Sequence, residues 1–284
     1  MCYTEQTITS EDGLRLHVRR SEAVYPRAET VLVHGFGEHC GRYALLTEHL
    51  IGQGYSVTAY DHRGHGLSEG LRGHVDRFRL YEDDLNCVIA SVRDRAGSRS
   101  LFIIGHSLGG LIALRYLASA AVDITGAVLS APLLGIAAGI PTHKLLIAKI
   151  ASRLAPRLRL DNGIDTKALS RDAEVGRAYA ADPLVNRLVS ARWFDEAVRA
   201  MQEAIDLAPA VSVPLLMMHG TEDRLASVEA TRRCFEHIGA SDKRLDVLEG
   251  FYHELFNEPE KNEVFAGVRN WLDARCAVRV LAAR

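Results

Sequence analysis

The chain has 284 residues, of which 48% are hydrophobic and 25% are charged, and its formal net charge is −2. This length and this hydrophobic content predict one large globular domain, or one domain with an insertion. The sequence has neither an excess of basic charge nor a block of Lys and Arg, which argues against a nucleic-acid partner.

The chain opens with a predicted β-hairpin, which is followed by alternating strands and helices. Residues 4–9 and 14–20 alternate in β fashion around a D-G turn at Asp12-Gly13. Further short apolar runs, separated by helical stretches, occupy residues 30–34, 56–60, 101–104, 127–130, 214–219 and 244–248. Apolar residues recur most clearly at helical spacing in 85–92 and 264–272. This pattern predicts an α/β fold with eight strands, mostly parallel, covered by helices on both faces.

A long insertion is predicted between the sixth and the seventh strand. About eighty residues between Pro132 and Val213 show helical patterning and no convincing strand. We interpret this segment as a helical cap, so that the chain divides into a first core part at 1–132, the cap at 133–212 and a second core part at 213–284.

One predicted helix of this cap is amphipathic. Its apolar stripe consists of His143, Leu146, Ile147, Ile150, Ala151 and Leu154. The favoured interpretation is that the stripe packs the cap onto the core, and the alternative is that the cap offers apolar surface to a lipid-like substrate. The nearby Arg153, Arg157 and Arg159 would favour an anionic lipid surface, although a solvated face is the simpler interpretation.

The sequence contains neither an evident targeting segment nor a membrane span. Its first residues reach Glu11 and Asp12 without an apolar run, which argues against a secretory signal. The apolar region at 133–154 is interrupted by Pro141 and Lys149, so it is too broken to span a bilayer. The cysteines are scattered, odd in number and never spaced as C-x-x-C, namely Cys2, Cys40, Cys87, Cys234 and Cys276. They indicate free thiols in a reducing compartment, and we therefore expect a cytoplasmic protein.

The strongest motif is a G-x-S-x-G turn at residues 105–109, between an apolar strand and an apolar helical run. In this context the motif forms a nucleophile elbow, which holds a serine on a strained turn at the C-terminal edge of the sheet. Gly105 and Gly109 have no Cβ that would clash with the neighbouring strand and helix. The motif therefore predicts Ser107 as a nucleophile.

A serine nucleophile needs a histidine base that is oriented by a carboxylate. In elbow-type sheets these partners follow in the order Ser, Asp or Glu, His, on loops after later strands. The loops after the last two predicted strands carry Asp223 and His253. We predict Asp223 as the acid, with Glu222 as the alternative, and His253 as the base. His219 and His237 are interpreted as structural histidines.

Two backbone N–H groups are the predicted donors to the oxyanion of the reaction. One belongs to Leu108, the residue after the nucleophile, and the other to Phe36, in the glycine-containing loop after the strand at 30–34. Asp61, His62 and His65 are close in sequence, but no second cluster completes a set of metal ligands. We interpret their segment as a loop held by hydrogen bonds. Since no phosphate-binding or dinucleotide-binding fingerprint follows a strand, we expect neither a metal nor a cofactor.

Four stretches of the chain, at residues 34–43, 61–70, 105–110 and 250–259, resemble the monoacylglycerol lipases of the α/β-hydrolase superfamily, in its bacterial branch. The motif H-G-x-G-E-H-x-x-R-Y at 34–43 is far more discriminating than the serine turn. A D-H-x-G-H-G-x-S loop follows it, and Tyr179 precedes a D-P pair, as at the end of the family's cap. The resemblance covers nearly the whole chain.

The resemblance implies an α/β-hydrolase fold with an eight-stranded, mostly parallel sheet and a helical cap inserted after the sixth strand. It implies the same triad and the same oxyanion donors as the interpretation of the residues. It further implies a polar pocket for the glycerol part of the substrate, with the acyl chain enclosed by the cap. The residues implied for this pocket are Glu38, Arg42, His106 and Tyr179. Phe36 is bulkier than the residue that some relatives carry there, and its ring would narrow the pocket.

These observations predict a serine hydrolase that cleaves monoacylglycerols to fatty acid and glycerol through an acyl-enzyme. Lysophospholipases, general carboxylesterases and some peptidases use the same scaffold, so the triad does not separate these activities. A ligand-binding receptor with a dormant triad is the remaining alternative. Because relatives settle on membranes through the cap, we also expect transient peripheral contact with a membrane surface. No oligomeric state is predicted.

Overall fold

The computed structural model describes residues 3–119 and 123–282, and its central feature is an eight-stranded sheet. The strand order is β1-β2-β4-β3-β5-β6-β9-β10. The pairs β1–β2 and β2–β4 are antiparallel, and the other pairs are parallel. The strands are β1 (Thr4–Thr9), β2 (Arg15–Ser21), β3 (Ala28–Val33), β4 (Tyr55–Tyr60), β5 (Ser100–His106), β6 (Gly126–Ser130), β9 (Leu215–Gly220) and β10 (Lys243–Leu248). All eight predicted strands are present, and the mostly parallel sheet is confirmed.

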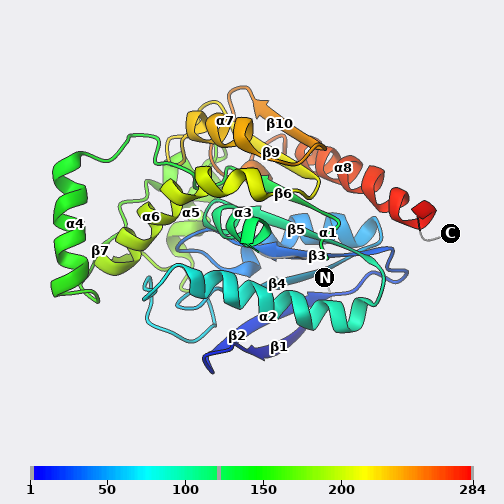
Figure 1. The fold of residues 1–284 in the computed structure, drawn as a ribbon, viewed down its shortest axis with the longest axis horizontal. Helices are drawn as coiled ribbons and strands as arrows, with labels where there is room; N and C mark the ends of the chain where they lie inside the picture. Colours follow the sequence, from blue (N-terminus) through cyan, green and yellow to red (C-terminus); the bar gives the residue numbers. More distant parts are fainter. Residues whose placement is uncertain (1–2, 120–122, 283–284) are drawn as a thin grey trace.

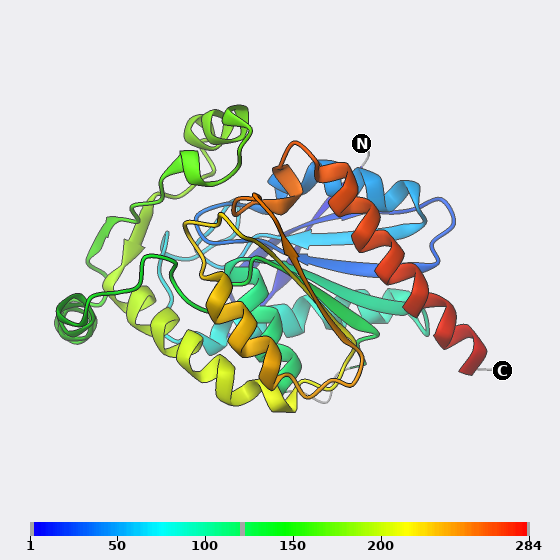
Figure 2. The same ribbon diagram turned by 90° about the horizontal axis from the view of Figure 1, so that it is seen from above.

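Helices cover both faces of this sheet (Figures 1 and 2). One face carries α1 (Ala44–Gly52) and α8 (Lys261–Ala282). The other face carries α2 (Arg79–Ala96), α3 (Leu108–Ser119), α6 (Ala191–Leu207) and α7 (Val228–His237). A separate hydrophobic cluster lies under each layer, and every residue of β3, β4 and β5 is buried. Burial on both sides explains why apolar residues predominate in these strands without a strict alternation.

The segment between β6 and β9 contains α4 (Thr142–Leu154) and α5 (Ala173–Ala181) in addition to α6. It also contains a small antiparallel sheet of β7 (Arg159–Asp161) and β8 (Leu188–Ser190). The expectation that this segment has no strand was therefore wrong. Each of these strands has only three residues, which is too short for an alternating pattern to be visible in the sequence.

Helix α6 connects this segment to the core. Its residues Trp193, Ala197, Ala200 and Ala204 are buried in the same hydrophobic cluster as α2 and α3. The division of the chain at 132 and 213 stays a prediction, since α6 lies inside the predicted cap and packs as a core helix.

Helix α4 lies at one end of the long axis of the molecule, away from the sheet (Figure 1). Four apolar side chains of its predicted stripe are 50–82% exposed, namely Leu146, Ile147, Ile150 and Leu154. The opposite side of α4 faces α6, where Ser152 Oγ donates to Asp195 Oδ2 at 2.9 Å. The favoured interpretation, in which the stripe packs the cap onto the core, was therefore wrong. Among the described residues, no helix has the length and apolar character needed to cross a membrane.

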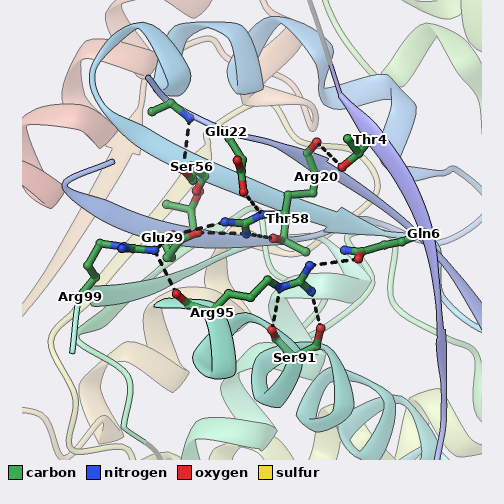
Figure 3. Close-up of polar contacts among 12 residues, drawn as sticks. Thr4, Gln6, Arg20, Glu22, Glu29, Ser56, Thr58, Ser91, Arg95 and Arg99 are labelled. Atoms are coloured by element: carbon green, nitrogen blue, oxygen red, sulfur yellow. Dashed lines mark hydrogen bonds and ion pairs between the residues drawn. The ribbon is translucent and has the colours of Figure 1, made fainter. Parts of the chain in front are cut away.

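A buried ion network fixes the edge of the sheet where the strands are antiparallel (Figure 3). Arg20 on β2 donates to Glu29 Oε2 on β3 and to Thr58 Oγ1 on β4, both at 3.1 Å. Arg99 donates to the other Glu29 oxygen at 2.9 Å, and the Glu29 side chain is fully buried. Because a buried carboxylate that loses its partner costs about 3–5 kcal/mol, this network holds β2 in its register on β4.

The described cysteines are free thiols, namely Cys40, Cys87, Cys234 and Cys276, and Cys2 lies outside the described residues.

Candidate active site

Ser107 lies at the junction between β5 and α3, as the sequence predicts. Its backbone φ is 52°, in the left-handed region that costs a residue with a Cβ about 1–2 kcal/mol. A Cβ at Gly105 would lie 2.6 Å from the carbonyl oxygen of Gly109, and a Cβ at Gly109 would clash with the carbonyl oxygen of Val33. The two glycines therefore allow the tight turn that places the serine at the C-terminal end of β5.

Asp223 and His253 lie on the loops after β9 and β10, and they are in direct contact. His253 Nδ1 is 2.7 Å from Asp223 Oδ2. The other carboxylate oxygen accepts hydrogen bonds from the backbone N–H groups of Leu225 at 2.8 Å and Ala226 at 3.0 Å. The predicted acid is thus fixed by its own loop, whereas Glu222, the alternative acid, is exposed.

The electrostatics of this pair suit a base and its orienting acid. Burial by itself would lower the pKa of His253, but Asp223, and more weakly Glu254 and Glu38, raise it above its ordinary value. Burial opposes ionisation of Asp223 too, but His253 and His219 hold the pKa of its carboxyl well below the usual range. Asp223 is therefore a carboxylate at neutral pH, and it favours the protonated form of His253.

Ser107 and His253 line the same cavity, whose volume is about 340 Å³. The loop after β3 closes one side of this cavity, since a Cβ at Gly35 would lie 3.3 Å from the Cβ of Ser107. Phe36, the next residue, lines the cavity and packs its ring against Trp193 at a centroid distance of 4.0 Å. The loop that carries one predicted oxyanion donor therefore lies against the serine, and Leu108, the other, is the first residue of α3.

The loop after β3 is held in place by the D-H-x-G-H-G segment at residues 61–66. His62 donates its backbone N–H to His34 Nε2 at 3.0 Å, and His62 Nε2 is 2.8 Å from the carbonyl oxygen of His34. Asp61 accepts the backbone N–H of Cys40 through Oδ1 and that of Leu67 through Oδ2, both at 2.8 Å. Hydrogen bonding thus accounts for this segment.

Among the described residues, one group places three metal-ligand types within 4.8 Å, namely His17, Cys40 and Asp61. The Asp61 oxygens are already used by the two loops. Burial, and then the Asp61 carboxylate, raise the pKa of the Cys40 thiol, which opposes the thiolate that a metal needs. We therefore assign no metal to this group.

The polar end of the cavity is built around a shared guanidinium. Arg42 Nη1 donates to Glu38 at 2.8 Å and to Glu254 at 2.7 Å, and Nη2 donates to the second Glu254 oxygen at 2.9 Å. The guanidinium also lies over the ring of Tyr179, at 4.8 Å from its centroid. Glu38, Glu254 and Tyr179 line the cavity. Arg42 therefore holds the two carboxylates that line this end of the cavity.

The two carboxylates are not equivalent. Burial raises the pKa of Glu38, and the attraction of Arg42 only partly offsets it. Burial acts on Glu254 as well, but the bidentate contact with Arg42 lowers the pKa of this group below its ordinary value. The polar end thus contains one firmly ionised carboxylate and one whose protonation responds to its surroundings.

His106 lies next to the base, with its ring centroid 4.8 Å from that of His253. Burial, and then the proximity of His253, lower the pKa of His106 to about 3. It is therefore a neutral imidazole at working pH. It lines the cavity beside Ser107, so the structure places it at the predicted polar pocket.

The rest of the cavity is mostly apolar, with Asn162 and Arg224 as its other polar side chains. Its walls come from the segment between β6 and β9, from α6 and from the loop after β9. They consist of Leu133, Ile136, Ala138, Ile164, Leu169, Val189, Trp193, Phe194, Ala197, Met201 and Leu225. Ser107 and His253 therefore lie in a cavity with a large apolar part and a small polar part.

Residues 25–260 match the model of the Hydrolase_4 family, which is described as serine aminopeptidase, S33. The chain belongs to this family. Over 248 residues it is 34% identical to a monoacylglycerol lipase of Mycolicibacterium smegmatis, with 87% of this chain and 88% of that protein covered. Over 250 residues it is 34% identical to phospholipase YtpA of Bacillus subtilis, with 87% and 96% covered.

Among solved structures, the monoacylglycerol lipase of Paleococcus ferrophilus is 36% identical and aligns with a TM-score of 0.82. The match covers 91% of this chain and 99% of that one. The resemblance to monoacylglycerol lipases and the α/β-hydrolase fold expected from the sequence are thereby confirmed.

The sequence motifs explain most of this site, but they did not indicate the contacts of two buried residues, Glu254 and His219. Glu254 follows the predicted base directly, between His253 and an apolar pair, and a charge in that position was the available signal. His219 was interpreted as a structural histidine, but its Nε2 is 3.1 Å from Asp223 Oδ2. The fold places Glu254 in the wall of the cavity and His219 against the carboxylate of Asp223.

Proposed function

We propose that this protein is a serine hydrolase that cleaves monoacylglycerols to a fatty acid and glycerol. The single observation that carries the proposal is the two-part cavity, in which an apolar pocket and a polar end meet at Ser107 and His253. A monoacylglycerol has the same two parts, a long acyl chain and a small headgroup with hydroxyls, joined by the ester.

In the proposed mechanism, Ser107 Oγ attacks the ester carbonyl carbon while His253 takes the hydroxyl proton through Nε2. Asp223 orients the ring at Nδ1 and stabilises the imidazolium that forms. The backbone N–H groups of Phe36 and Leu108 donate to the oxyanion. The tetrahedral intermediate expels glycerol, whose oxygen receives the proton from His253, and leaves an acyl group on Ser107.

The second half of the reaction uses the same groups in reverse. His253 takes a proton from a water molecule, which attacks the acyl carbonyl carbon. Collapse of the second intermediate returns the proton to Ser107 Oγ and releases the fatty acid. One water is consumed, one ester bond is broken, and the protein is restored.

The apolar walls of the cavity support a long acyl chain. Each methylene moved from water into such a pocket gains about 0.8 kcal/mol. Chains too long for the cavity lose this gain, and Phe36, packed on Trp193, narrows the space beside the serine. We therefore propose a preference for medium and long acyl esters over acetate.

The polar end supports a neutral headgroup. The buried carboxylates of Glu38 and Glu254 accept hydrogen bonds from hydroxyls, whereas they repel a phosphate. Arg42 is already bound to both carboxylates, so its charge is not free for an anion. For this reason we favour a monoacylglycerol over a lysophospholipid, although a phospholipase is among the relatives.

The exposed stripe of α4 supports a further part of the proposal, transient contact with a membrane surface. This helix belongs to the segment between β6 and β9, which also forms walls of the cavity. Its exposed apolar side chains are Leu146, Ile147, Ile150 and Leu154. Exposed basic residues such as Arg153 and Arg157 lie on or next to the helix. This combination suits an interfacial helix on an anionic surface.

A substrate panel with the purified protein tests the proposed function. We expect kcat/KM for a medium-chain monoacylglycerol to exceed that for the matching lysophosphatidylcholine by at least about tenfold, because the phosphate meets the two carboxylates. A short nitrophenyl ester should be cleaved more slowly, and a peptide with an N-terminal proline should not be cleaved. Preference for the lysophospholipid or for the peptide would contradict the proposal, and so would failure to cleave any ester, which the receptor alternative predicts.

A further inference from the structure

The acid of the site is contacted by two imidazoles, not one. Asp223 Oδ2 is 2.7 Å from His253 Nδ1 and 3.1 Å from His219 Nε2. Its Oδ1 accepts two backbone N–H groups, as described above. The carboxylate thus has four hydrogen-bonding neighbours, and His219 shares with His253 the oxygen that orients the base.

His219 is held in a fixed orientation inside the protein. It lies near the end of β9, its side chain is fully buried, and its Nδ1 is 2.9 Å from Thr231 Oγ1 on α7. Its Nε2 faces two acceptors, Asp223 Oδ2 and the carbonyl oxygen of Ala226 at 3.3 Å. Both neighbours of Nε2 are acceptors, so this nitrogen carries the proton and Nδ1 accepts the hydroxyl proton of Thr231. A neutral ring satisfies every one of these contacts.

We propose that His219 is a positioning residue of the hydrolysis, which holds Asp223 through its Nε2–H and limits how strongly that carboxylate attracts the proton of His253. The inference rests on the proposed function, in which His253 is the base. It differs from the interpretation of His219 as a merely structural histidine, because it gives His219 an effect on the proton affinity of His253.

The physical argument concerns one oxygen with two donors. The N–H of His219 donates to Asp223 Oδ2 and partly offsets the negative charge on that oxygen. Without this donor, the charge of the oxygen would act on His253 alone. Without this donor, the carboxylate stabilises the imidazolium more strongly and is less firmly oriented. The first effect raises the pH at which His253 loses its proton, and the second slows the reaction.

Other charged and titratable groups also face His253, and the test must leave them unchanged. They are Glu254 next to it, Glu38 across the cavity and the neutral His106, with Arg42 behind the two carboxylates. Arg224, beside Asp223, is exposed and directed to Tyr252. None of these groups contacts His219 in the hydrogen bonds and ion pairs described above.

The experiment compares His219→Phe with His219→Gln, whose amide can return a donor to the place of Nε2. The first readout is the NMR titration of the His253 ring, identified by its loss in His253→Ala, which requires no turnover. The second is the pH profile of kcat/KM with a short nitrophenyl ester. For His219→Phe we expect the His253 titration to move up by about 0.5–1 pH unit and kcat to fall roughly tenfold. His219→Gln should recover most of both.

A matched control separates this effect from lost packing. Cys234 is fully buried on α7, near Thr231, so Cys234→Ala should lower the melting temperature and leave the His253 titration unchanged. Thr231→Val is a second variant, which keeps the His219 ring but removes the partner of its Nδ1. It should shift the His253 titration in the same direction by a smaller amount.

The inference would be overturned if the His253 titration stayed in place in both His219→Phe and Thr231→Val, or if it shifted equally in Cys234→Ala. If the NMR shift occurs while the wild-type protein cleaves no ester, the proposed function fails and the positioning of Asp223 by His219 stands.

Discussion

Glu254, the residue directly after His253, combines two effects in one buried carboxylate. It binds Arg42 through both oxygens, and it is one of the groups that raise the pKa of His253. Glu254→Gln removes the charge and keeps the shape. We expect the acidic limb of the pH profile of kcat/KM to move down by roughly 0.5–1 pH unit, since the neutral His253 then persists to lower pH. We also expect a rise in KM for monoacylglycerol, because the polar end loses an acceptor.

The control for this prediction is Glu249→Gln, an exposed carboxylate at the start of the same loop, directly after β10. It should leave both the pH profile and KM unchanged. A Glu254→Gln protein whose acidic limb stays in place would show that this carboxylate has no influence on the base. Measuring the profile with a short nitrophenyl ester and with a monoacylglycerol separates the effect on proton affinity from the effect on the headgroup.

The residues of the site that could be predicted from the sequence are those whose chemistry is tied to a local motif. Ser107 has its glycine-flanked turn, and Asp223 and His253 follow strands whose ends meet at one edge of the sheet. Glu254 and His219 carry no such local signature. The role of each depends on the group that it contacts in the folded protein. His219 contacts the carboxylate of Asp223. Glu254 contacts the guanidinium of Arg42, which lies 212 positions earlier in the chain.

At the level of elements, α4 is the helix whose exposure most needs an explanation. Its apolar side chains at 146, 147, 150 and 154 remain in solvent, although each would gain about 1.5–3 kcal/mol on full burial. We expect the double variant Ile147→Glu with Leu154→Glu to lose at least about tenfold in its affinity for vesicles that contain an anionic lipid. The measurement is co-sedimentation with vesicles of phosphatidylcholine and phosphatidylglycerol.

The control variant for the α4 prediction is Tyr25→Glu, at a side chain that is 87% exposed on the loop before β3. It should bind vesicles as the unmodified protein does. Both variants should cleave a short dissolved ester at the normal rate, which shows that the fold and the triad are intact. Equal vesicle binding by all three proteins would exclude α4 as the contact surface.

The elements that the sequence predicts well are the long, buried ones. β3, β4 and β5 are rich in apolar residues because both of their faces are covered, and a polar side chain such as Glu29 has buried partners there. The short strands β7 and β8 escape prediction because three residues form less than two periods of alternation. The periodicity of α4 correctly indicates an amphipathic helix, but it does not say whether the apolar face meets the core or the surroundings, since both give the same pattern.

Across the whole molecule, buried histidines make the stability of the fold sensitive to acid. Burial, the largest cause, lowers the pKa of His34 and His62 well below the ordinary value, that of His65 to about 4 and that of His106 to about 3. The unfolded chain binds protons at these imidazoles near pH 6.5, but the folded chain does not. The free energy of unfolding must therefore fall as the pH drops from 6.5 toward 4, by up to about 1.4 kcal/mol per pH unit for each histidine.

The sign for His253 is the opposite. Its pKa is raised in the folded protein, so it contributes stability below its unfolded pKa, and this contribution is lost as the pH rises through the folded value. Two buried carboxyls with a raised pKa, Glu38 and Asp84, act in the same direction as His253. The four imidazoles lose their contribution across the whole window from pH 6.5 to 5, so they leave a net loss of stability in acid. Urea unfolding at pH 7.0, 6.0 and 5.0 measures it in a window above the titration of ordinary carboxyls. His237→Ala, at an exposed ring, should leave the slope unchanged. A free energy of unfolding that is constant from pH 7 to 5 would contradict the prediction.

The central claim is that Ser107, which lies between the apolar pocket and the polar end of the cavity, cleaves the ester bond of a neutral lipid. The most direct measurement is the release of fatty acid from a medium-chain monoacylglycerol by the unmodified protein and by Ser107→Ala. Removal of a triad member lowers kcat by about 10⁴-fold or more in such sites. We predict steady release of fatty acid by the unmodified protein and a loss of that order in Ser107→Ala, with unchanged thermal unfolding. Equal release by the two proteins, or none by either, would contradict the account.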